Sequence, residues 1–221
     1  AFPVSVDPMV LFYNRTLLSK RGIAYPPAYW DEVVKITPEL VLRNGDVFKE
    51  TSIPLGAPNS PYAKDIIMTI IAQLGQVPVV QIPMQGGGIY NNVLINSPVA
   101  EGGEVLPLST AVRFFTQFAD PGQGAYSWNQ LQGNASDVFV GEKLAMYIGY
   151  AGELGTLRAR NPRAQFEMTY LPQTRGYNTF ATGMRMYALA TLKNSKNMQA
   201  SFVTQAQFAG AGVSPAIAAV A

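Results

Sequence analysis

The side chains that could perform chemistry in this sequence are mainly carboxylates. The 221 residues include no cysteine and no histidine, which removes disulfides, thiolate nucleophiles, the usual zinc ligand sets and the commonest general base at neutral pH. Two carboxylate pairs remain, Asp31 with Glu32 and Asp137 with Glu142, and a glycosidase would use such a pair. Both pairs lie on expected helices, where helix-cap or surface roles explain them, and their spacing in sequence does not give their separation in space.

Nucleotide and nucleic-acid chemistry find no support in the sequence. The glycine run "QGGGIYNN" (85–92) lacks the lysine and hydroxyl residue that end a phosphate-binding loop and opens no expected helix, so we interpret it as a loop. The 16 Lys and Arg are scattered and the net charge is only +2, whereas a nucleic-acid groove needs a basic stripe. We therefore expect no cofactor, no metal site and no nucleic-acid partner.

Composition indicates a folded protein of one domain or one and a half. The hydrophobic fraction is 48% and the charged fraction 14%, which suits a chain that buries a core. The longest apolar stretch, "IIMTIIAQLG" (66–75), is too short to cross a bilayer and predicts a buried helix. Because the chain opens on Ala1 without a signal peptide, we expect a processed or truncated form of an exported protein, with a cytoplasmic protein as the alternative.

The first elements are marked by clear start and stop signals. A strand is expected over residues 3–14, with Pro8 as an irregularity near its middle. Asn14 is the predicted N-cap of a short helix that ends at Gly22. A helix over residues 28–41 follows a double proline, and its early acidic residues suit the positive end of the helix dipole.

The rest of the chain alternates between the two kinds of element, which predicts an α/β domain with a mixed or mostly parallel sheet. The expected elements are a buried strand (52–58), a helix (61–75), loop and hairpin (76–103), a helix (108–119), helix–strand–helix (134–162), two strands (166–173 and 183–190) and a helix (194–210) capped by Ser195 or Asn197.

Four segments resemble one family when they are taken together and in order. They are "VLFYNRTLLSKRGIAYPPAYWDEV", "FVGEKLAM", "MTYLPQ" and "NSKNMQASFVTQAQFAG". This set resembles the sugar-type solute-binding proteins of ABC importers (maltose-binding-protein-like, family 1), although Lys143 sits one place later than the usual lysine. The resemblance implies an α/β fold of the periplasmic-binding-protein-like type II class, with two lobes, a cleft between them and no catalytic residues.

The resemblance also implies how the chain is divided. Residues 1–14 would be a hinge strand, 15–170 the second lobe, 171–182 the return hinge, and 183–221 a strand and helix of the first lobe. The chain would then be a fragment that lacks most of its first lobe. Without that lobe an apolar face would be exposed, and such a face favours self-association. We therefore expect a homodimer, with exchange of the terminal segments as one way to form it.

The implied function is capture of a carbohydrate by hinge closure and delivery to a membrane permease of an ABC importer. The implied location is periplasmic or extracellular, with a lipid anchor on a full-length parent left open. Two alternatives stand beside this function: a carboxylate-based glycosidase, and a self-associating fragment that binds no ligand.

Two candidate ligand contacts come from the first half of the chain. Asp7 lies just before the "VLFYN" stretch, at the hinge, where its carboxylate would accept hydrogen bonds from paired sugar hydroxyls. Its alternative role is a turn or cap residue before Pro8. Tyr62 lies at a strand-to-helix turn, where its ring would pack on the apolar face of a sugar. Its alternative role is to cover the first turn of its own helix.

The remaining candidates come from the second half. Gly152 stands where the family often carries a stacking tryptophan, so Tyr150 or Trp128 would have to supply the ring, with ordinary packing as the alternative for both. Met184 and Arg185 follow the return hinge and would line the cleft from the other lobe. Arg185 has a surface or inter-lobe role as its alternative.

Overall fold

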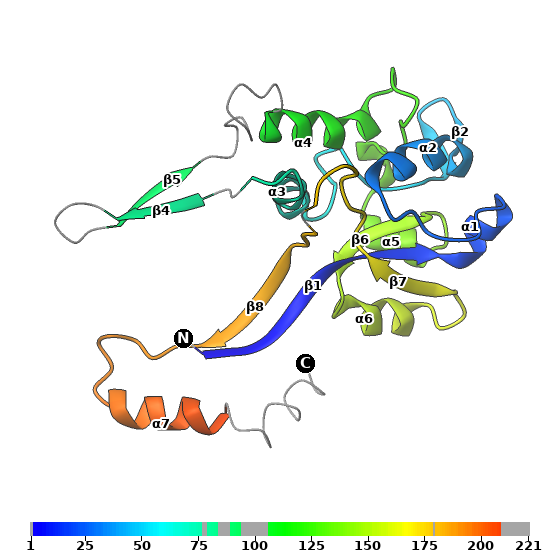
Figure 1. The fold of residues 1–221 in the computed structure, drawn as a ribbon. Helices are drawn as coiled ribbons and strands as arrows, with labels where there is room; N and C mark the ends of the chain where they lie inside the picture. Colours follow the sequence, from blue (N-terminus) through cyan, green and yellow to red (C-terminus); the bar gives the residue numbers. More distant parts are fainter. Residues whose placement is uncertain (1, 77–78, 84–88, 94–105, 179, 209–221) are drawn as a thin grey trace.

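One long strand, β1 (Phe2–Asn14), pairs with three other strands and lies at the centre of the main sheet (Figure 1). In this computed structural model, β1 pairs with β6 (Met146–Tyr150) and β7 (Phe166–Tyr170) along its second half, and with β8 (Met184–Leu189) along its first half. The sheet order is β6-β1-β7, with β8 off this path. The structure describes residues 2–76, 79–83, 89–93, 106–178 and 180–208.

The helices follow the order that the sequence predicts. They are α1 (Arg15–Lys20), α2 (Trp30–Leu40), α3 (Ala63–Gln73), α4 (Pro107–Thr116), α5 (Ala135–Val140), α6 (Glu153–Arg160) and α7 (Met198–Phe208), with 3-10 turns η1 (Gln117–Ala119) and η2 (Gln130–Gln132). Two separate hairpins complete the described elements: β2 (Leu42–Asn44) with β3 (Val47–Glu50), and β4 (Val79–Pro83) with β5 (Ile89–Val93).

The expected strand direction is wrong. All three ladders that β1 makes are antiparallel, and the parallel contacts in the described chain are two isolated bridges. The reason lies in where the partner strands begin. Met146 opens β6 opposite Tyr13, and Phe166 opens β7 opposite Asn14, so each connection returns to the end at which β1 stops, and the chain direction reverses.

The expected strand over residues 52–58 is also absent, although its burial is correctly predicted. Ile53 and Leu55 are fully buried, yet the segment has no ladder and only an isolated bridge from Thr51. Pro54 and Pro58 have no N–H for a ladder, and Gly56 turns the chain with φ +89. The segment is therefore a buried, irregular connection.

The structure describes only part of the segment that contains the glycine run, residues 76–103. A hairpin was expected within 76–103, and the pairing of β4 with β5 confirms it. The second half of "QGGGIYNN" belongs to β5 rather than to a loop. Residues 84–88 and 94–105 lie outside the described residues.

The predicted helix signals at the end of β1 are confirmed. The Asn14 side chain accepts a hydrogen bond from the Leu17 N–H at 3.1 Å, as an N-cap does. Gly22 follows the helix with φ +72, a conformation that favours glycine. Strand β1 therefore passes directly into α1 without a loop.

Two hydrophobic cores lie on opposite faces of the sheet, as the period-2 alternation of β1 requires. Leu11 points into the core with α2, α3 and α4, and Phe12 points into the core with α5 and α6. Trp128 is fully buried in the second core, and its Nε1 donates to Asn59 Oδ1 at 3.0 Å. The suggestion that Trp128 supplies a ligand-stacking ring is therefore wrong, because the core encloses the indole.

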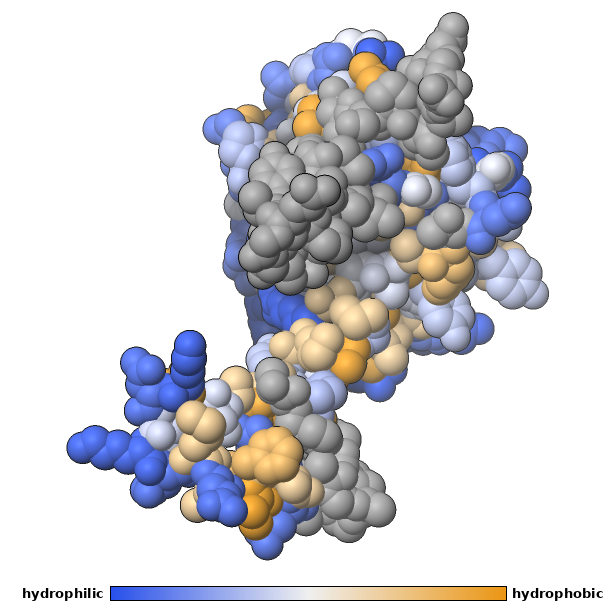
Figure 2. All heavy atoms as spheres, turned by 60° about the vertical axis from the view of Figure 1, so that its left-hand side comes forward, coloured by the Kyte–Doolittle hydropathy of each residue, from blue (hydrophilic) through white to orange (hydrophobic). Residues whose placement is uncertain are grey.

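The first half of β1 leaves these cores and forms a two-stranded ribbon with β8 (Figure 1). Pro8 marks the change of partner, since it pairs with Met184 and the next residue, Met9, pairs with Tyr150. Figure 2 shows a smaller part of the molecule that hangs below the main body on a narrow neck. Among the described residues, no helix has both the length and the apolar character that a membrane crossing requires.

Candidate functional site

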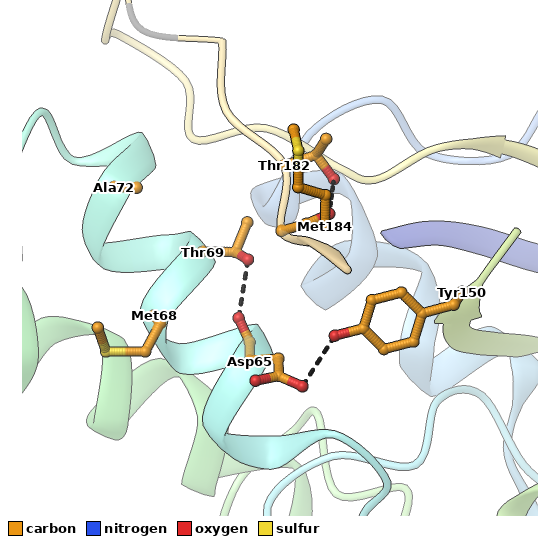
Figure 3. Close-up of a pocket in the computed structure, with 8 residues that line it drawn as sticks. Asp65, Met68, Thr69, Ala72, Tyr150, Thr182 and Met184 are labelled. Carbon is orange, nitrogen blue, oxygen red and sulfur yellow. Dashed lines mark hydrogen bonds between the residues drawn. The ribbon is translucent and has the colours of Figure 1, made fainter. Parts of the chain in front are cut away.

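Two hollows lie where the β1–β8 ribbon meets the main body. The larger, of about 890 Å³, runs between the ribbon and the start of α6; its lining includes Asp7, Gly152, Glu153 and Tyr187. The smaller, of about 190 Å³, lies between α3 and the start of β8. Figure 3 shows side chains from α3, Tyr150 and the chain around Met184 converging on this smaller hollow.

Asp7 joins the ribbon to helix α6. Its Oδ1 accepts a hydrogen bond at 2.8 Å from the N–H of Gly152, the residue that precedes α6. This contact satisfies a helix N-terminal donor and places a negative charge at the positive end of the helix dipole. A Cβ on Gly152 would lie 3.2 Å from Asp7 Oδ2, so a glycine here permits close approach. Asp7 thus caps α6 from within β1 rather than a turn before Pro8, and it lines the larger hollow.

Tyr150 joins the sheet to α3. Its hydroxyl donates to Asp65 Oδ2 at 2.8 Å, and the residue is only 3% exposed. Burial, followed by the hydrogen bond to Asp65, raises the pKa of Tyr150 to about 12. Asp65 lies in the first turn of α3, where its charge suits the helix dipole.

Arg185 lies over both candidate tyrosine rings. Its guanidinium carbon is 3.7 Å from the centroid of the Tyr150 ring and 5.0 Å from that of Tyr62, a cation–π arrangement. The two rings meet edge to face, with centroids 5.0 Å apart. Arg185 is also the strand partner of Asp7, so this residue connects the ribbon to the body.

Tyr62 adopts a backbone conformation that is uncommon for a residue with a side chain. It precedes α3 with φ +53, in the left-handed region. Burial, followed by the carboxylate of Glu153, raises the pKa of Tyr62. Strain of this kind persists only where surrounding contacts fix it, and it is frequent at binding sites.

Glu153 is a site residue that the sequence reasoning missed. Its Oε1 accepts from the Tyr150 N–H at 2.8 Å, and its Oε2 accepts from the Tyr147 hydroxyl at 2.8 Å. Burial, followed by the charge of Glu153, raises the pKa of Tyr147 well above its usual range. An acidic residue directly after a glycine at a helix start was the signal that could have found Glu153, and the same first-turn position marks Asp65.

The structure therefore brings all six predicted site residues to one region. The set consists of Asp7, Tyr62, Tyr150, Gly152, Met184 and Arg185. They come from β1, the start of α3, β6, the start of α6 and β8. Their role toward a ligand stays a prediction.

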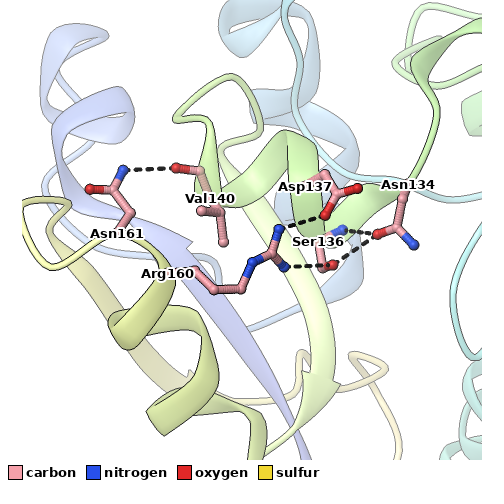
Figure 4. A network of polar contacts seen from close by, with 6 residues as sticks. All are labelled: Asn134, Ser136, Asp137, Val140, Arg160 and Asn161. Atoms are coloured by element: carbon pink, nitrogen blue, oxygen red, sulfur yellow. Dashed lines mark hydrogen bonds and ion pairs between the residues drawn. The ribbon is translucent and has the colours of Figure 1, made fainter.

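The carboxylate pairs that a glycosidase would need lie on the surface, away from these hollows. Asp31 and Glu32 both bind Arg175, at 3.0 and 2.7 Å. Asp137 binds Arg160 at 2.5 Å and joins α5 to α6, as Figure 4 shows. In the described ranges, no group of three or more carboxylates could hold a metal ion.

The comparisons with known proteins give one family match and several matches of fold. The model of the bacterial extracellular solute-binding protein family matches residues 1–207. No curated protein sequence matches the chain. Among solved structures, the chain is similar to an ABC substrate-binding protein from Listeria monocytogenes in complex with cycloalternan, with 17% identity, a TM-score of 0.62, and coverage of 98% of this chain and 49% of that one.

Two further solved structures show the same relationship. The maltotriose-binding protein of Thermus thermophilus has 16% identity and a TM-score of 0.56, with coverage of 98% and 51%. The maltose/maltodextrin-binding domain from Bdellovibrio bacteriovorus, bound to maltotriose, has 15% identity and a TM-score of 0.58, with coverage of 96% and 50%. The chain thus spans about half the length of these proteins and shares their α/β, periplasmic-binding-protein-like fold.

Proposed function

The chain belongs to the bacterial extracellular solute-binding protein family, and from this premise we propose that it binds a carbohydrate between the β1–β8 ribbon and the main body. The observation that carries the proposal is that Asp7 lines the larger hollow and Tyr150 lines the smaller one. Arg185 links the two, because it is the strand partner of Asp7 and lies over the Tyr150 ring. The similar proteins from Listeria and Thermus are described with oligosaccharides bound, which supports a sugar as the ligand class.

The groups around the hollows suit a neutral polyhydroxy ligand. Asp7 offers Oδ2 as a hydroxyl acceptor, because only its Oδ1 is used by Gly152. Arg185 offers guanidinium donors, which the tyrosine rings beneath it hold in a fixed plane. Met184 adds an apolar wall to the smaller hollow. Acceptors, donors and apolar surface side by side are what binding a sugar ring requires.

The proposed mechanism is closure of two lobes about the strands that join them. The hinge would lie at residues 1–14 and 171–182, between the second lobe of residues 15–170 and the first lobe, to which residues 183–221 contribute. The change of strand partner at Pro8 supports a pivot there. A ligand that contacts both lobes binds the closed state better and shifts the population toward it.

Delivery of the sugar to a membrane permease of an ABC importer completes the proposal. This step rests on the family assignment, which also makes an extracellular location the expected one. The family is one of binding proteins, so we propose no covalent chemistry and no cofactor. The two carboxylate pairs that the sequence singled out are bound to arginines on the surface, so they do not support a glycosidase.

A thermal-shift and calorimetry screen tests the proposal. The probes are maltotriose, mannotriose, ribitol and glucuronate, each with the wild type, Asp7→Asn and the surface control Asp120→Asn. A ligand at 100 times its Kd stabilises by about 2.7 kcal/mol, which is about 5–10 °C for a chain of this size. We expect a shift with a neutral sugar that Asp7→Asn reduces and Asp120→Asn does not. Equal shifts in both variants, or none with any carbohydrate, would contradict the site.

A further inference from the structure

The smaller hollow, between α3 and the start of β8, is lined by four polar side chains. They are Asp65, Thr69, Tyr150 and Thr182. Three of them carry a hydroxyl group, which has one hydrogen to donate and two lone pairs that accept. The direction of the hydrogen bonds that these hydroxyls already make therefore decides what they can offer to a ligand.

All three hydroxyl hydrogens are used inside the protein. Thr69 Oγ1 donates to the Asp65 carbonyl at 2.7 Å, and Tyr150 Oη donates to Asp65 Oδ2 at 2.8 Å, as Figure 3 shows. Thr182 Oγ1 donates to the Met9 carbonyl at 2.8 Å. Each partner is a carbonyl or carboxylate oxygen, which only accepts, so the hydroxyl must be the donor. These hydroxyls therefore offer a ligand lone pairs and no hydrogen.

The fourth polar side chain adds a charged acceptor. Asp65 Oδ2 accepts from Tyr150, whereas Oδ1 has a long ion pair of 3.8 Å with the exposed Lys64, which solvent weakens. Arg185 lies over the face of the Tyr150 ring but does not line this hollow. The polar side chains that line the hollow thus present acceptors to a ligand.

The shape of the hollow keeps these acceptors within reach of a ligand. A Cβ on Gly183 would lie 2.8 Å from Thr69 Oγ1, so the glycine leaves this oxygen uncovered. Met68, Ala72 and Met184 supply an apolar lining. The volume of about 190 Å³ is smaller than the roughly 300–1,000 Å³ of sites that enclose a whole ligand. The hollow therefore suits one group of a larger ligand.

We propose that this hollow selects its ligand by hydrogen-bond polarity, which rests on the carbohydrate binding proposed above. It receives a free sugar hydroxyl that donates to Asp65 Oδ1 or to a threonine lone pair. A group that only accepts, such as an ether, a fluorine or a carboxylate, would place its lone pairs against those of the hollow. Both sides would then lose water without gaining a hydrogen bond. The favoured ligand is a sugar that is neither oxidised nor substituted at this hydroxyl.

Deoxy and deoxyfluoro sugars test this selection. The probes are glucose and mannose with one hydroxyl replaced at a time, by hydrogen in one series and by fluorine in the other, with affinities measured by calorimetry. Both replacements lose the donated hydrogen, but fluorine also turns the negative end of a dipole toward the acceptors. At the position that enters the hollow, the fluoro sugar should bind at least about fivefold more weakly than the deoxy sugar. A hollow with donors would give the opposite order.

Three variants assign the effect to the hollow. Asp65→Asn keeps an oxygen for the Tyr150 hydroxyl and adds two N–H donors, so the order of the fluoro and deoxy sugars should reverse. Thr69→Val removes one acceptor with little change of shape and should narrow the difference between them. Thr116→Val on α4 is the matched control: its Oγ1 likewise donates to the carbonyl four residues earlier, at 2.9 Å, but it does not line this hollow. It should leave every ratio of affinities unchanged.

The outcomes separate the polarity selection from carbohydrate binding itself. If the parent sugar binds but no fluoro sugar is weaker than its deoxy partner, or if Asp65→Asn leaves their order unchanged, the selection is overturned alone. If glucose, mannose, maltotriose and mannotriose all fail to bind, carbohydrate binding is overturned and the selection with it. A reversal at one ring position in Asp65→Asn, without any change in Thr116→Val, is the result that we expect.

Discussion

The side chain of Gln73 gives the sharpest test of how the main body is held together. Gln73 is the last residue of α3 and is fully buried. Its Oε1 accepts from Trp30 Nε1 at 2.7 Å and from Thr174 Oγ1 at 3.2 Å. Its Nε2 donates to the carbonyls of Pro172 and Ala181, at 3.0 and 2.9 Å. One amide thus uses all four of its hydrogen bonds to fasten α3, α2 and the segment that leads to β8.

Replacing Gln73 by methionine keeps the volume and removes every one of these bonds. The indole N–H of Trp30 and the Pro172 carbonyl would be left buried without this partner, and the Ala181 carbonyl, which is only partly buried, would also lose its bond. Each unsatisfied buried group costs about 1–3 kcal/mol. We therefore expect Gln73→Met to lose about 3–5 kcal/mol of the free energy of unfolding, a large share for a domain whose whole stability is of the order of 5–15 kcal/mol.

Urea unfolding followed by tryptophan fluorescence measures this loss. The sequence has two tryptophans, both buried in the folded state, so the signal reports the main body. Gln199→Met on α7 is the matched control, since that glutamine is exposed, and it should change the stability by less than about 0.5 kcal/mol. A Gln73→Met protein within 1 kcal/mol of wild type would refute the assigned role of the network.

A second variant separates hydrogen bonding from packing. Gln73→Glu has nearly the same shape, but its carboxylate faces two carbonyl oxygens. Burial would raise the pKa of this carboxyl in the folded state, so the folded chain binds a proton that the unfolded chain releases. The stability of Gln73→Glu should therefore fall as the pH rises through the unfolded value of about 4.3. A pH-independent difference from wild type between pH 4 and 8 would contradict this reasoning.

Three further predictions concern stability and are measured by the same urea unfolding. Tyr150→Phe removes the hydrogen bond to Asp65 and should lower the free energy of unfolding by about 1–2 kcal/mol at pH 8. The folded-state pKa of Tyr150 is about 12, above the unfolded value of about 10, so the stabilisation by Tyr150 is complete below pH 10 and is lost between pH 10 and 12. The difference in stability between wild type and Tyr150→Phe should therefore narrow in that range. A gap that stays constant would exclude this titration. Gly56→Ala should cost more than about 1 kcal/mol, because φ is +89 and the new Cβ would lie 2.8 Å from the Phe115 carbonyl; an unchanged unfolding midpoint would show that the turn relaxes freely. Asn14→Ala should cost about 0.5–2 kcal/mol through loss of the α1 cap, and Asn14→Ser should restore part of it, whereas equal losses in both variants would argue against a capping role.

Most helices and strands could be predicted from the sequence, because the signals that start and stop them lie within a few residues of their ends. The cap at Asn14 and the stop at Gly22 bracket α1 as expected, and the alternation of apolar residues in β1 fits two cores. Strand direction was not predicted, since it depends on where the connections return. Pro54 and Pro58 show the limit of composition: the segment around them is as buried as a strand but has no ladder to join.

The arrangement of the site depends on contacts between residues far apart in the sequence. The bond from Gly152 to Asp7 spans 145 positions, and no local pattern encodes it. The family resemblance named both residues, because a shared fold fixes which turns meet. It gave no indication of Glu153, whose role comes from the particular tyrosines beside it, or that Trp128 lies in the core.

The geometry around Tyr150 also indicates what kind of recognition the hollows favour. Arg185 lies 3.7 Å from the centre of the Tyr150 ring, so it covers that face, and Tyr62 meets the ring edge to face. Asp7 lies so close to Gly152 that even a Cβ there would be tightly packed, which leaves no room for a large ring at the place where a stacking residue was considered. The polar groups beside them are Oδ2 of Asp7, which Gly152 does not use, and the guanidinium of Arg185, which lies over the Tyr150 ring. Since these two residues are strand partners on the ribbon, a ligand that binds both would be held mainly by hydrogen bonds, and its affinity should depend on the position of the ribbon.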